Sequence, residues 1–298
     1  MFKSVAFIVN PVAGSAKLGR IVAELSRRLT AAGGRSTILK TAGPAHAVEL
    51  SRGAGEDIEA IVAVGGDGTV REVAAGRLDR PLPLLILPAG TENLLARHLG
   101  IVASVECLWD CLTRGVVRPF DIGLVNGRCF LIVAGAGFDA QVVDRLARAR
   151  RGHITRGDYF WPLWRTFWEY RFPPIHVTAD GQTLFQGRGL AFVGNIAHYG
   201  MGLRILRDAR DHDGLLDVCV YPCSGRGRLL VHSCYTAVRR HVERPDVIYR
   251  RASRVRIESS APLALEADGD LAGTLPAELT VLPSRAQFCV AEGYPELP

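Results

Sequence analysis

The 298-residue sequence predicts an α/β protein of two domains, an N-terminal domain built on a parallel sheet and a C-terminal, mostly antiparallel β-sandwich. Two observations lead to this class. In the first third of the chain, apolar runs alternate with helical patterns, the rhythm of a parallel sheet covered by helices. Beyond about residue 119, strand-like runs follow one another across short turns. We therefore place the domains at 1–118 and 119–298, and whether the C-terminal tail packs back on the first domain stays open.

The N-terminal domain begins with a short apolar strand that Asn10-Pro11 ends. A helix with one buried face should follow and end at Gly33-Gly34, because apolar residues recur at helical spacing. These residues are Leu18, Ile21, Val22, Leu25 and Leu29. The later elements are strands over 36–40, 58–64 and 84–87, and helices over 44–52, over 70–75 and up to residue 98.

The C-terminal domain is marked by hairpin turns. Asn126-Gly127 and Asp180-Gly181 each lie between apolar runs, and such dipeptides favour two-residue hairpin loops. Strands are expected on both sides of these turns, and also over 189–194, 215–221, 254–259, 263–266 and 279–282. Two helices interrupt the strands, around 138–150 and 158–170.

Composition narrows the class of protein. With 48% hydrophobic and 22% charged residues the chain is globular rather than disordered or fibrous. Its seven cysteines form no zinc-site spacing, which indicates reduced thiols in a cytoplasmic protein. No apolar run has the length of a signal or of a membrane span, so any membrane contact should be peripheral. A net charge of +6 suits nucleotides, acidic lipid or nucleic acid alike.

The most specific motif is Gly65-Gly66-Asp67-Gly68-Thr69, placed between a buried strand and a helix. Its glycines let main-chain N–H groups approach an anion, and the following helix adds its positive dipole end. Asp67 brings a carboxylate to a place where phosphates would otherwise be repelled, which makes sense if it acts through a metal or on a hydroxyl. A glycine-rich turn with a capping aspartate is the structural alternative, and the strand–turn–helix context favours phosphate binding.

This motif resembles the GGDGT signature of the diacylglycerol kinase catalytic-domain family, which is related to sphingosine and ceramide kinases. Three further segments resemble the lipid-kinase branch in the expected order: Asn10–Gly14, Leu87–Asn93 and Asp211–Asp217. The resemblance implies an ATP-dependent, Mg²⁺-using kinase that phosphorylates the hydroxyl of a neutral lipid such as diacylglycerol, with its site in the cleft between the domains. No nucleic-acid partner is expected, and the sequence leaves open whether the chain forms a homodimer.

Site residues follow from the resemblance position by position. The ATP-binding positions would be Asn10, Pro11, Val12, Ala13, Gly14, Thr41, Gly65, Gly66, Asp67, Gly68, Thr69, Val70, Arg71 and Thr91. Asp213 matches a side chain that holds a structural Mg²⁺ in bacterial relatives, with the carbonyl groups of Arg210 and Leu215, although Asp-Gly is also an ordinary turn. Asp67 and Asp270 would be catalytic, Asp270 as the general base toward the lipid hydroxyl.

Two departures from the family pattern concern these positions. Asp270 stands where the family usually has glutamate, one methylene longer. Leu94 follows the Pro88–Asn93 loop where the family commonly has aspartate, and Ser15 stands where some members have lysine. Charge near the terminal phosphate should therefore differ from that of the better-known enzymes. A non-catalytic relative that binds lipid or nucleotide, or an enzyme like NAD kinase, is the alternative function.

Lipid contact is expected at the aromatic segment Asp158–Tyr170, which holds three of the four tryptophans. Five arginines lie just upstream of this segment: Arg145, Arg148, Arg150, Arg151 and Arg156. Aromatic residues beside arginines suit the headgroup region of an anionic membrane, here the inner face of the cell membrane. Packing of the same aromatic residues on the β domain is the alternative.

Overall fold

The structure is a computed structural model that describes residues 1–13, 16–149 and 156–293. The chain forms two compact units: unit 1 comprises Met1–Phe120 with the described residues 284–293, and unit 2 comprises Asp121–Pro283. The change at 120–121 falls two residues from the boundary expected from the sequence. The last residues divide differently, because they join unit 1 rather than the sandwich.

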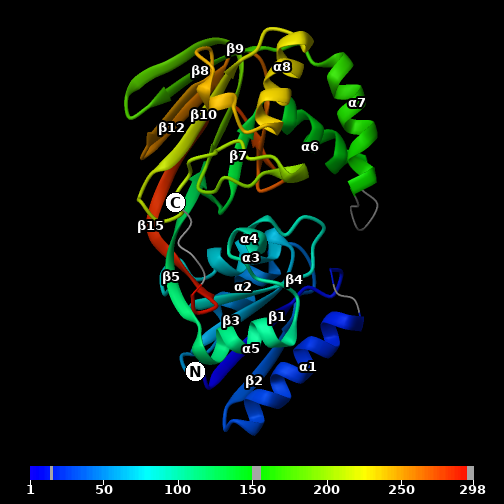
Figure 1. The fold of residues 1–298 in the computed structure, drawn as a ribbon, viewed down its shortest axis with the longest axis vertical. Helices are drawn as coiled ribbons and strands as arrows, with labels where there is room; N and C mark the ends of the chain where they lie inside the picture. Colours follow the sequence, from blue (N-terminus) through cyan, green and yellow to red (C-terminus); the bar gives the residue numbers. More distant parts are fainter. Residues whose placement is uncertain (14–15, 150–155, 294–298) are drawn as a thin grey trace. The chain divides into compact units, whose positions relative to one another are not determined.

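Unit 1 alternates strands and helices as predicted (Figure 1). In order, its elements are β1 (Ser4–Val9), α1 (Ala16–Ala31), β2 (Arg35–Lys40), α2 (His46–Arg52), β3 (Ala60–Gly65), α3 (Asp67–Ala75), β4 (Pro83–Pro88), α4 (Leu94–His98) and α5 (Val105–Arg114). The strands run parallel in the order β2-β1-β3-β4. The central strands are apolar and buried on both faces, which is typical of a parallel sheet covered by helices.

The end of the chain completes this sheet. The long strand β15 (Ala277–Val290) carries its last residues alongside β4, in parallel, with Gln287 opposite Pro83. Phe288 and Cys289 are fully buried there, and Phe288 packs edge-on against Phe120 at a ring-centre distance of 5.1 Å. Burial of these side chains explains why the C-terminal segment belongs to unit 1.

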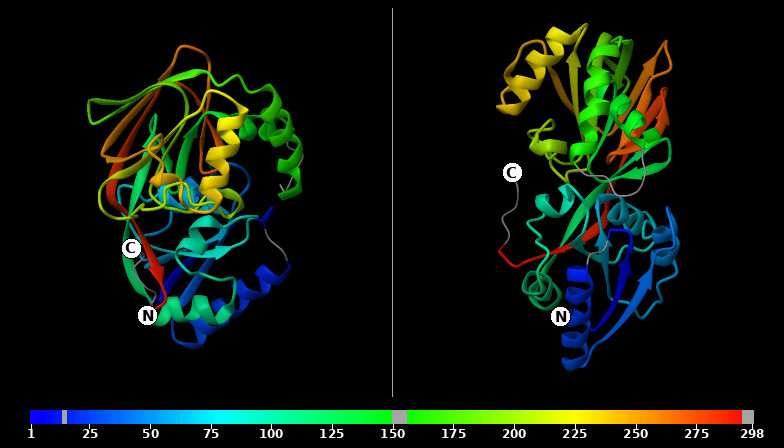
Figure 2. Two further views of the ribbon diagram at one scale, coloured as in Figure 1. Left: turned by 45° about the horizontal axis from the view of Figure 1, so that its top comes forward. Right: turned by 90° about the vertical axis from the view of Figure 1, so that its right-hand side faces the viewer.

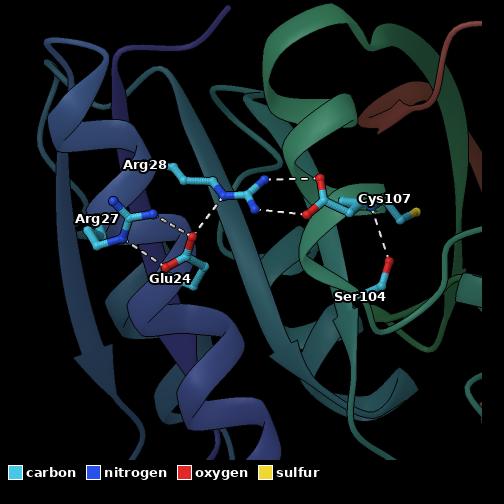
Figure 3. A network of polar contacts seen from close by, with 6 residues as sticks. Glu24, Arg27, Arg28, Ser104 and Cys107 are labelled. Carbon is cyan, nitrogen blue, oxygen red and sulfur yellow. Dashed lines mark hydrogen bonds and ion pairs between the residues drawn. The ribbon is translucent and has the colours of Figure 1, made fainter.

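Helices α1 and α5 pack together on one face of the sheet, where Leu25, Leu29 and Leu108 are fully buried. A surface network also joins them: Glu24 accepts hydrogen bonds from Arg27 and Arg28, and Arg28 donates to Glu106 of α5 (Figure 3). Arg27 and Glu106 are largely exposed and Glu24 and Arg28 about one-third exposed, so the pairs add little to stability beside the apolar contact. The sequence analysis did not predict α5, although Ser104 caps it by accepting the N–H of Cys107.

Unit 2 is a β-sandwich with helices outside its sheets (Figure 2). After β5 (Val116–Val125), which begins in unit 1, its elements are β6 (Arg128–Phe130), β7 (Val133–Ala136), α6 (Phe138–Ala149), α7 (Phe160–Glu169), β8 (Pro174–Ala179), β9 (Gln182–Gly194), β10 (Leu216–Pro222), α8 (Arg226–Ala237), β11 (Ile248–Ala252), β12 (Arg254–Ser259), β13 (Ala264–Ala267) and β14 (Asp270–Thr274). Strand β9 serves both layers. Its first part pairs with β8, and its last part pairs with β7 and β10, all antiparallel.

The predicted hairpin turns are present. Asn126-Gly127 joins β5 to β6 and Asp180-Gly181 joins β8 to β9, in both cases with positive φ at both turn residues. Asp268-Gly269 joins β13 to β14 in the same way, with φ of 52° and 79°. Positive φ at both positions matches the twist of antiparallel strands, which is why Asn-Gly and Asp-Gly occur there. The predicted fold class is confirmed.

Candidate active site

The Gly65–Thr69 motif forms a tight turn from β3 into α3, with Gly66 as the residue that caps the helix. A side chain at Gly65 would stand 2.4 Å from the Thr69 hydroxyl, so this position has no room for one. Gly66 caps the helix without a side chain, and its carbonyl accepts the N–H of Thr69 at 2.9 Å. The first turn of α3 therefore presents main-chain N–H groups and the positive end of the helix dipole to an anion.

The loop after β1 is tied to this turn by Asn10. Its side-chain amide donates to the Thr69 hydroxyl at 3.2 Å, and its Oδ1 accepts the N–H of Val12 at 3.0 Å. The Asn10 carbonyl also accepts the N–H of Ala13, so one residue shapes the start of the loop. Pro11 and Val12 are exposed, and the predicted ligand Gly14 lies outside the described residues.

Asp67 joins the motif to the next loop. Its carboxylate accepts the N–H of Leu94 at 2.9 Å and that of Leu95 at 3.0 Å, the first amides of α4. The two loops also meet directly: the N–H of Ala89 donates to the Gly65 carbonyl, and a side chain at Gly90 would lie 2.7 Å from the Gly66 Cα. The role of Asp67 in holding α4 is one that sequence reasoning missed.

The remaining predicted nucleotide ligands surround the same edge of the sheet. Thr41 follows β2, is 9% exposed, and donates its N–H to the Val9 carbonyl. Val70 and Arg71 are buried in α3, whereas Thr91 is exposed in the loop after β4. Since the carboxyl ends of parallel strands share one edge, the fold of unit 1 brings the loops after β1, β2, β3 and β4 to that edge, where open α/β sheets commonly bind ligands.

In unit 2, the hairpin that carries Asp270 is held by the neighbouring Asp268. The Asp268 carboxylate accepts the N–H groups of Leu131, Ile132 and Val133 at 2.8, 2.9 and 3.1 Å. Sequence reasoning did not single out Asp268, because an aspartate before glycine is typical of an ordinary turn. The turn is fixed from both sides, because the Asp268 N–H donates to the Val133 carbonyl.

Asp270, the predicted base, is the first residue of β14 and is half-exposed. Arg128 lies 3.6 Å from its carboxylate and also donates to the Leu271 carbonyl at 2.6 Å. The carboxylate is thus accessible and has a cation beside it.

At the predicted metal position, the Asp213 carboxylate is bonded to protein groups rather than left open for a metal ion. Asp213 Oδ1 accepts the N–H of Leu215 at 3.0 Å, and Oδ2 accepts from the Arg251 guanidinium at 3.0 Å. A metal ion would have to displace Arg251, itself a cation. Among the described residues, no group of three or more His, Cys, Asp or Glu side chains is placed to hold a metal. With Arg251 bonded to Asp213, this arrangement does not favour Mg²⁺, and a metal site at Arg210, Asp213 and Leu215 stays a prediction.

Asp121, at the start of unit 2, supports the same loop. It is fully buried, and its Oδ2 accepts the N–H of Gly214 at 2.6 Å.

Nearby, Asp217 is also fully buried, and burial raises the pKa of its carboxyl to about 6. Tyr249 donates to Asp217 Oδ1 at 2.8 Å. Asp217 and Tyr249 line a pocket of about 370 Å³ together with Asp208, Arg210, Arg250 and Arg251.

Comparison with known proteins agrees with this geometry. The diacylglycerol kinase catalytic domain model matches residues 4–125, and the model described as YegS C-terminal NAD kinase beta sandwich-like domain matches residues 132–290. A diacylglycerol kinase of Mycobacterium tuberculosis (strain ATCC 25618 / H37Rv) is 32% identical over 245 residues, which cover 80% of this chain and 79% of the relative. The chain belongs to the diacylglycerol kinase family.

Other members of the family align over almost the whole length. A diacylglycerol kinase of Bacillus subtilis (strain 168) is 27% identical over 285 residues, 94% of either chain. A crystal structure from Bacillus anthracis str. Sterne, assigned as a diacylglycerol kinase, superposes with a TM-score of 0.79 at 26% identity and covers 98% of each chain. The chain is therefore a kinase of the lipid-kinase type, which transfers phosphate to an alcohol group.

Proposed function

We propose that this chain is an ATP-dependent lipid kinase that phosphorylates the hydroxyl of a neutral lipid such as diacylglycerol. The observation that carries the proposal is the joined pair of loops in unit 1. The Gly65–Thr69 turn, at the start of α3, touches the loop after β4, and Asp67 bonds both amides that begin α4. Membership of the diacylglycerol kinase family supports the same reaction.

ATP binding is assigned to unit 1. The N–H groups of the 66–69 turn and the dipole of α3 would hold phosphate oxygens, and Asn10 keeps the Thr69 hydroxyl in place. Mg²⁺ that enters with the nucleotide would neutralise the phosphate charge. Catalysis of this kind depends mainly on positioning and charge stabilisation, so the rigid contact between the two loops is the useful feature.

Proton removal from the lipid hydroxyl is assigned to Asp270 in unit 2. Its carboxylate is half-exposed and could therefore reach a hydroxyl, and Arg128 lies 3.6 Å from it. Its side chain is one methylene shorter than the glutamate of the family, so the turn at Asp268-Gly269 has to bring the backbone closer to the hydroxyl. Leu94 lacks the carboxylate usual in the family and contributes only its N–H, to Asp67.

The test uses the purified chain, ATP labelled at the γ-phosphate, and mixed vesicles that contain diacylglycerol. Label in the organic phase is the expected result, and it should disappear in Asp270→Asn and persist in the exposed control Asp79→Asn. Label on added NAD would replace the proposal by a NAD kinase activity, an alternative suggested by the name of the model that matches residues 132–290. Bound ATP without any transfer would identify a non-catalytic relative.

The lipid is expected at a membrane surface, which α7 would contact. Along one side of this helix, Phe160, Trp161, Trp164 and Trp168 are between 49% and 66% exposed. The sequence left two alternatives for these aromatic residues, membrane contact and packing on the β domain. Rings that are this exposed are not packed on the β domain. Among the described residues, no helix is long and apolar enough to cross a membrane. Arg150 and Arg151 lie outside the described residues, and nothing is inferred from them.

Helix α8 extends the same surface. Arg226 at its start donates to the carbonyl groups of Phe167 and Trp168, and its guanidinium lies 5.3 Å from the Trp168 ring centre. Leu230 on α8 and Val238, which follows its last residue, are 53% and 63% exposed, and Figures 1 and 2 show both helices outside the sheets of unit 2. Exposed apolar groups on two neighbouring helices suit the boundary between headgroups and acyl chains.

The positive charge of the surface formed by α7 and α8 favours an anionic bilayer, rather than a second copy of the chain, as what binds there. Residues 224–242 include four arginines and no acidic residue. Arg228 and Arg240 remain 52% and 69% exposed although each pairs with a carboxylate. Symmetric self-association through this surface would bring like charges together, whereas acidic lipid complements them.

Sedimentation with vesicles tests this part. Binding to phosphatidylglycerol-containing vesicles should fall at least tenfold when Trp161, Trp164 and Trp168 are all replaced by Ala. The control Met201→Ala, at a residue that is 66% exposed in the same unit, should bind normally. Unchanged binding of the triple variant would overturn the assignment of α7. If the wild type and the control form a concentration-dependent dimer and the triple variant does not, the surface would instead be assigned to a second copy of the chain.

A further inference from the structure

A buried pair of carboxyl groups lies directly behind the hairpin that carries Asp270. Glu266, on β13, is 1% exposed, and Asp139 stands in the first turn of α6. Asp139 Oδ1 and Glu266 Oε1 are buried and accept no hydrogen bond from any described residue, so a proton held between the two side chains is the donor that this pair lacks. Gly135 on β7 leaves space for both, because a side chain there would stand 2.2 Å from Asp139 Oδ2 and 2.9 Å from Glu266 Oε1. Neither residue was singled out from the sequence.

Two buried carboxyl groups this close cannot both be ionised at low cost, so we infer that they share a proton. Asp139 is the better anion of the two. It lies at the positive end of α6, and the Tyr199 hydroxyl donates to its Oδ2 at 3.2 Å. Burial raises the pKa of Glu266 well above its usual range, and the Asp139 charge raises it further. Burial raises the pKa of Asp139 only to about 6, because hydrogen bonds from Ala140 and Tyr199 favour its anion.

The other titratable groups around the pair are acids and phenols from each neighbouring element. Asp268 and Asp270 raise the pKa of Glu266, while Tyr199 and Tyr170 have raised pKa values because of burial and the Asp139 charge. Tyr159 acts on Tyr199 in the same direction. These groups favour keeping the shared proton in place.

Glu266 has a second contact, and it leads to the site. Its Oε2 accepts the N–H of Gly269 at 2.9 Å, in the two-residue turn just before Asp270. One Glu266 oxygen therefore holds the turn, while the other lies beside Asp139 of α6 next to Gly135. Asp268 fixes the other side of the turn, so Gly269 is held only if Glu266 keeps its position.

We propose that Glu266 is a positioning residue for the phosphoryl transfer: as a neutral acid it donates to Asp139, accepts from Gly269, and so sets the place of Asp270. The proposal deepens the proposed function and rests on it for the role of Asp270. No covalent step is assigned to Glu266, which touches neither substrate. Its neutral form is required, because an ionised Glu266 would repel Asp139 and release the turn.

The test compares Glu266→Gln with Glu266→Ala. Glutamine keeps an oxygen for the Gly269 N–H and an N–H for Asp139, so kcat should stay within threefold of wild type. Alanine removes both contacts, and kcat should fall at least 20-fold with the KM for ATP unchanged, since nucleotide binding is assigned to unit 1. The control Glu278→Gln, at an exposed glutamate of unit 2, should match wild type. As pH rises, the wild type should lose activity before Glu266→Gln does, because only the wild type has a Glu266 proton to lose.

Amide hydrogen exchange at Gly269 gives a readout that does not depend on turnover. Exchange should be at least tenfold faster in Glu266→Ala than in the wild type and unchanged in Glu266→Gln. If the wild type transfers no phosphate, the proposed function fails while exchange still decides whether Glu266 holds the turn. Equal exchange in all three proteins would overturn the proposal, and so would equal kcat in Glu266→Ala and the wild type.

Discussion

Replacement of Asp67 separates two roles of its carboxylate, one in holding α4 and one in the transfer of phosphate. The side chain accepts two backbone N–H groups, from Leu94 and Leu95, at 2.9 and 3.0 Å. Asp67→Ala removes both bonds. Asp67→Asn keeps the shape and one acceptor oxygen, but it turns an N–H group toward the second amide and removes the charge. The two variants therefore differ in stability, while both lack the carboxylate.

The magnitude can be worked out from these contacts. A hydrogen bond to a charged group contributes about 1.5–3 kcal/mol, and loss of a helix cap costs about 0.5–2 kcal/mol. Because Asp67 is half-exposed, we expect losses at the lower end, about 2–3 kcal/mol for Asp67→Ala and about 1 kcal/mol for Asp67→Asn. A domain stable by about 5–15 kcal/mol stays almost fully folded after such losses. Unfolding alone would therefore lower activity by only a few per cent.

Transfer should fall far more than folding does. Removal of a group that acts on the reacting hydroxyl or phosphate typically costs about 100-fold or more in rate. Urea unfolding of unit 1 and transfer of labelled phosphate to diacylglycerol, measured on the same samples, give the comparison. The exposed control Asp79→Ala should leave both quantities unchanged. Transfer within threefold of wild type by folded Asp67→Asn would refute a chemical role and leave Asp67 as an anchor of α4 alone.

Three further predictions follow from the contacts of unit 2. Asp268→Ala leaves three backbone N–H groups without their acceptor, so the free energy of unfolding should fall by about 3–5 kcal/mol; a loss below 1 kcal/mol in urea would contradict this. Because Arg251 bonds Asp213, EDTA should not lower the melting temperature of the nucleotide-free chain, and a drop of several degrees would show a structural metal. Burial raises the pKa values of Glu266 and Asp139, so the folded state keeps protons that the unfolded state loses above about pH 4. The stability of the wild type relative to Glu266→Gln should therefore fall as pH rises toward and beyond 6. A difference that is flat or rises with pH would contradict the shared proton.

The sequence was sufficient to predict the parts of the fold that depend on local chemistry. Apolar strands separated by amphipathic helices gave the parallel sheet of unit 1, and Asn126-Gly127 and Asp180-Gly181 gave two hairpins at the correct register. The Gly65–Thr69 motif lies between a strand and a helix as predicted, and Gly65 stands where a side chain would clash. In each case the signal lies within a few neighbouring residues.

Features that depend on contacts between distant segments were not predictable in the same way. The Glu266–Asp139 pair joins β13 to α6 across more than a hundred residues, and nothing in either local sequence signals a buried proton. The bond of Asp67 to α4 and the pairing of Asp213 with Arg251 are of the same kind. The return of the C-terminal residues to unit 1 depends on the pairing of β15 with β4, which no local pattern encodes.

The central claim is that the 65–69 turn binds the phosphates of ATP, and a crystal structure with a non-hydrolysable ATP analogue and Mg²⁺ tests it most directly. We expect phosphate oxygens within hydrogen-bond distance of the main-chain N–H groups at the start of α3, with Asp67 still bonded to Leu94 and Leu95. An analogue bound elsewhere, with the turn empty at saturating concentration, would contradict the account.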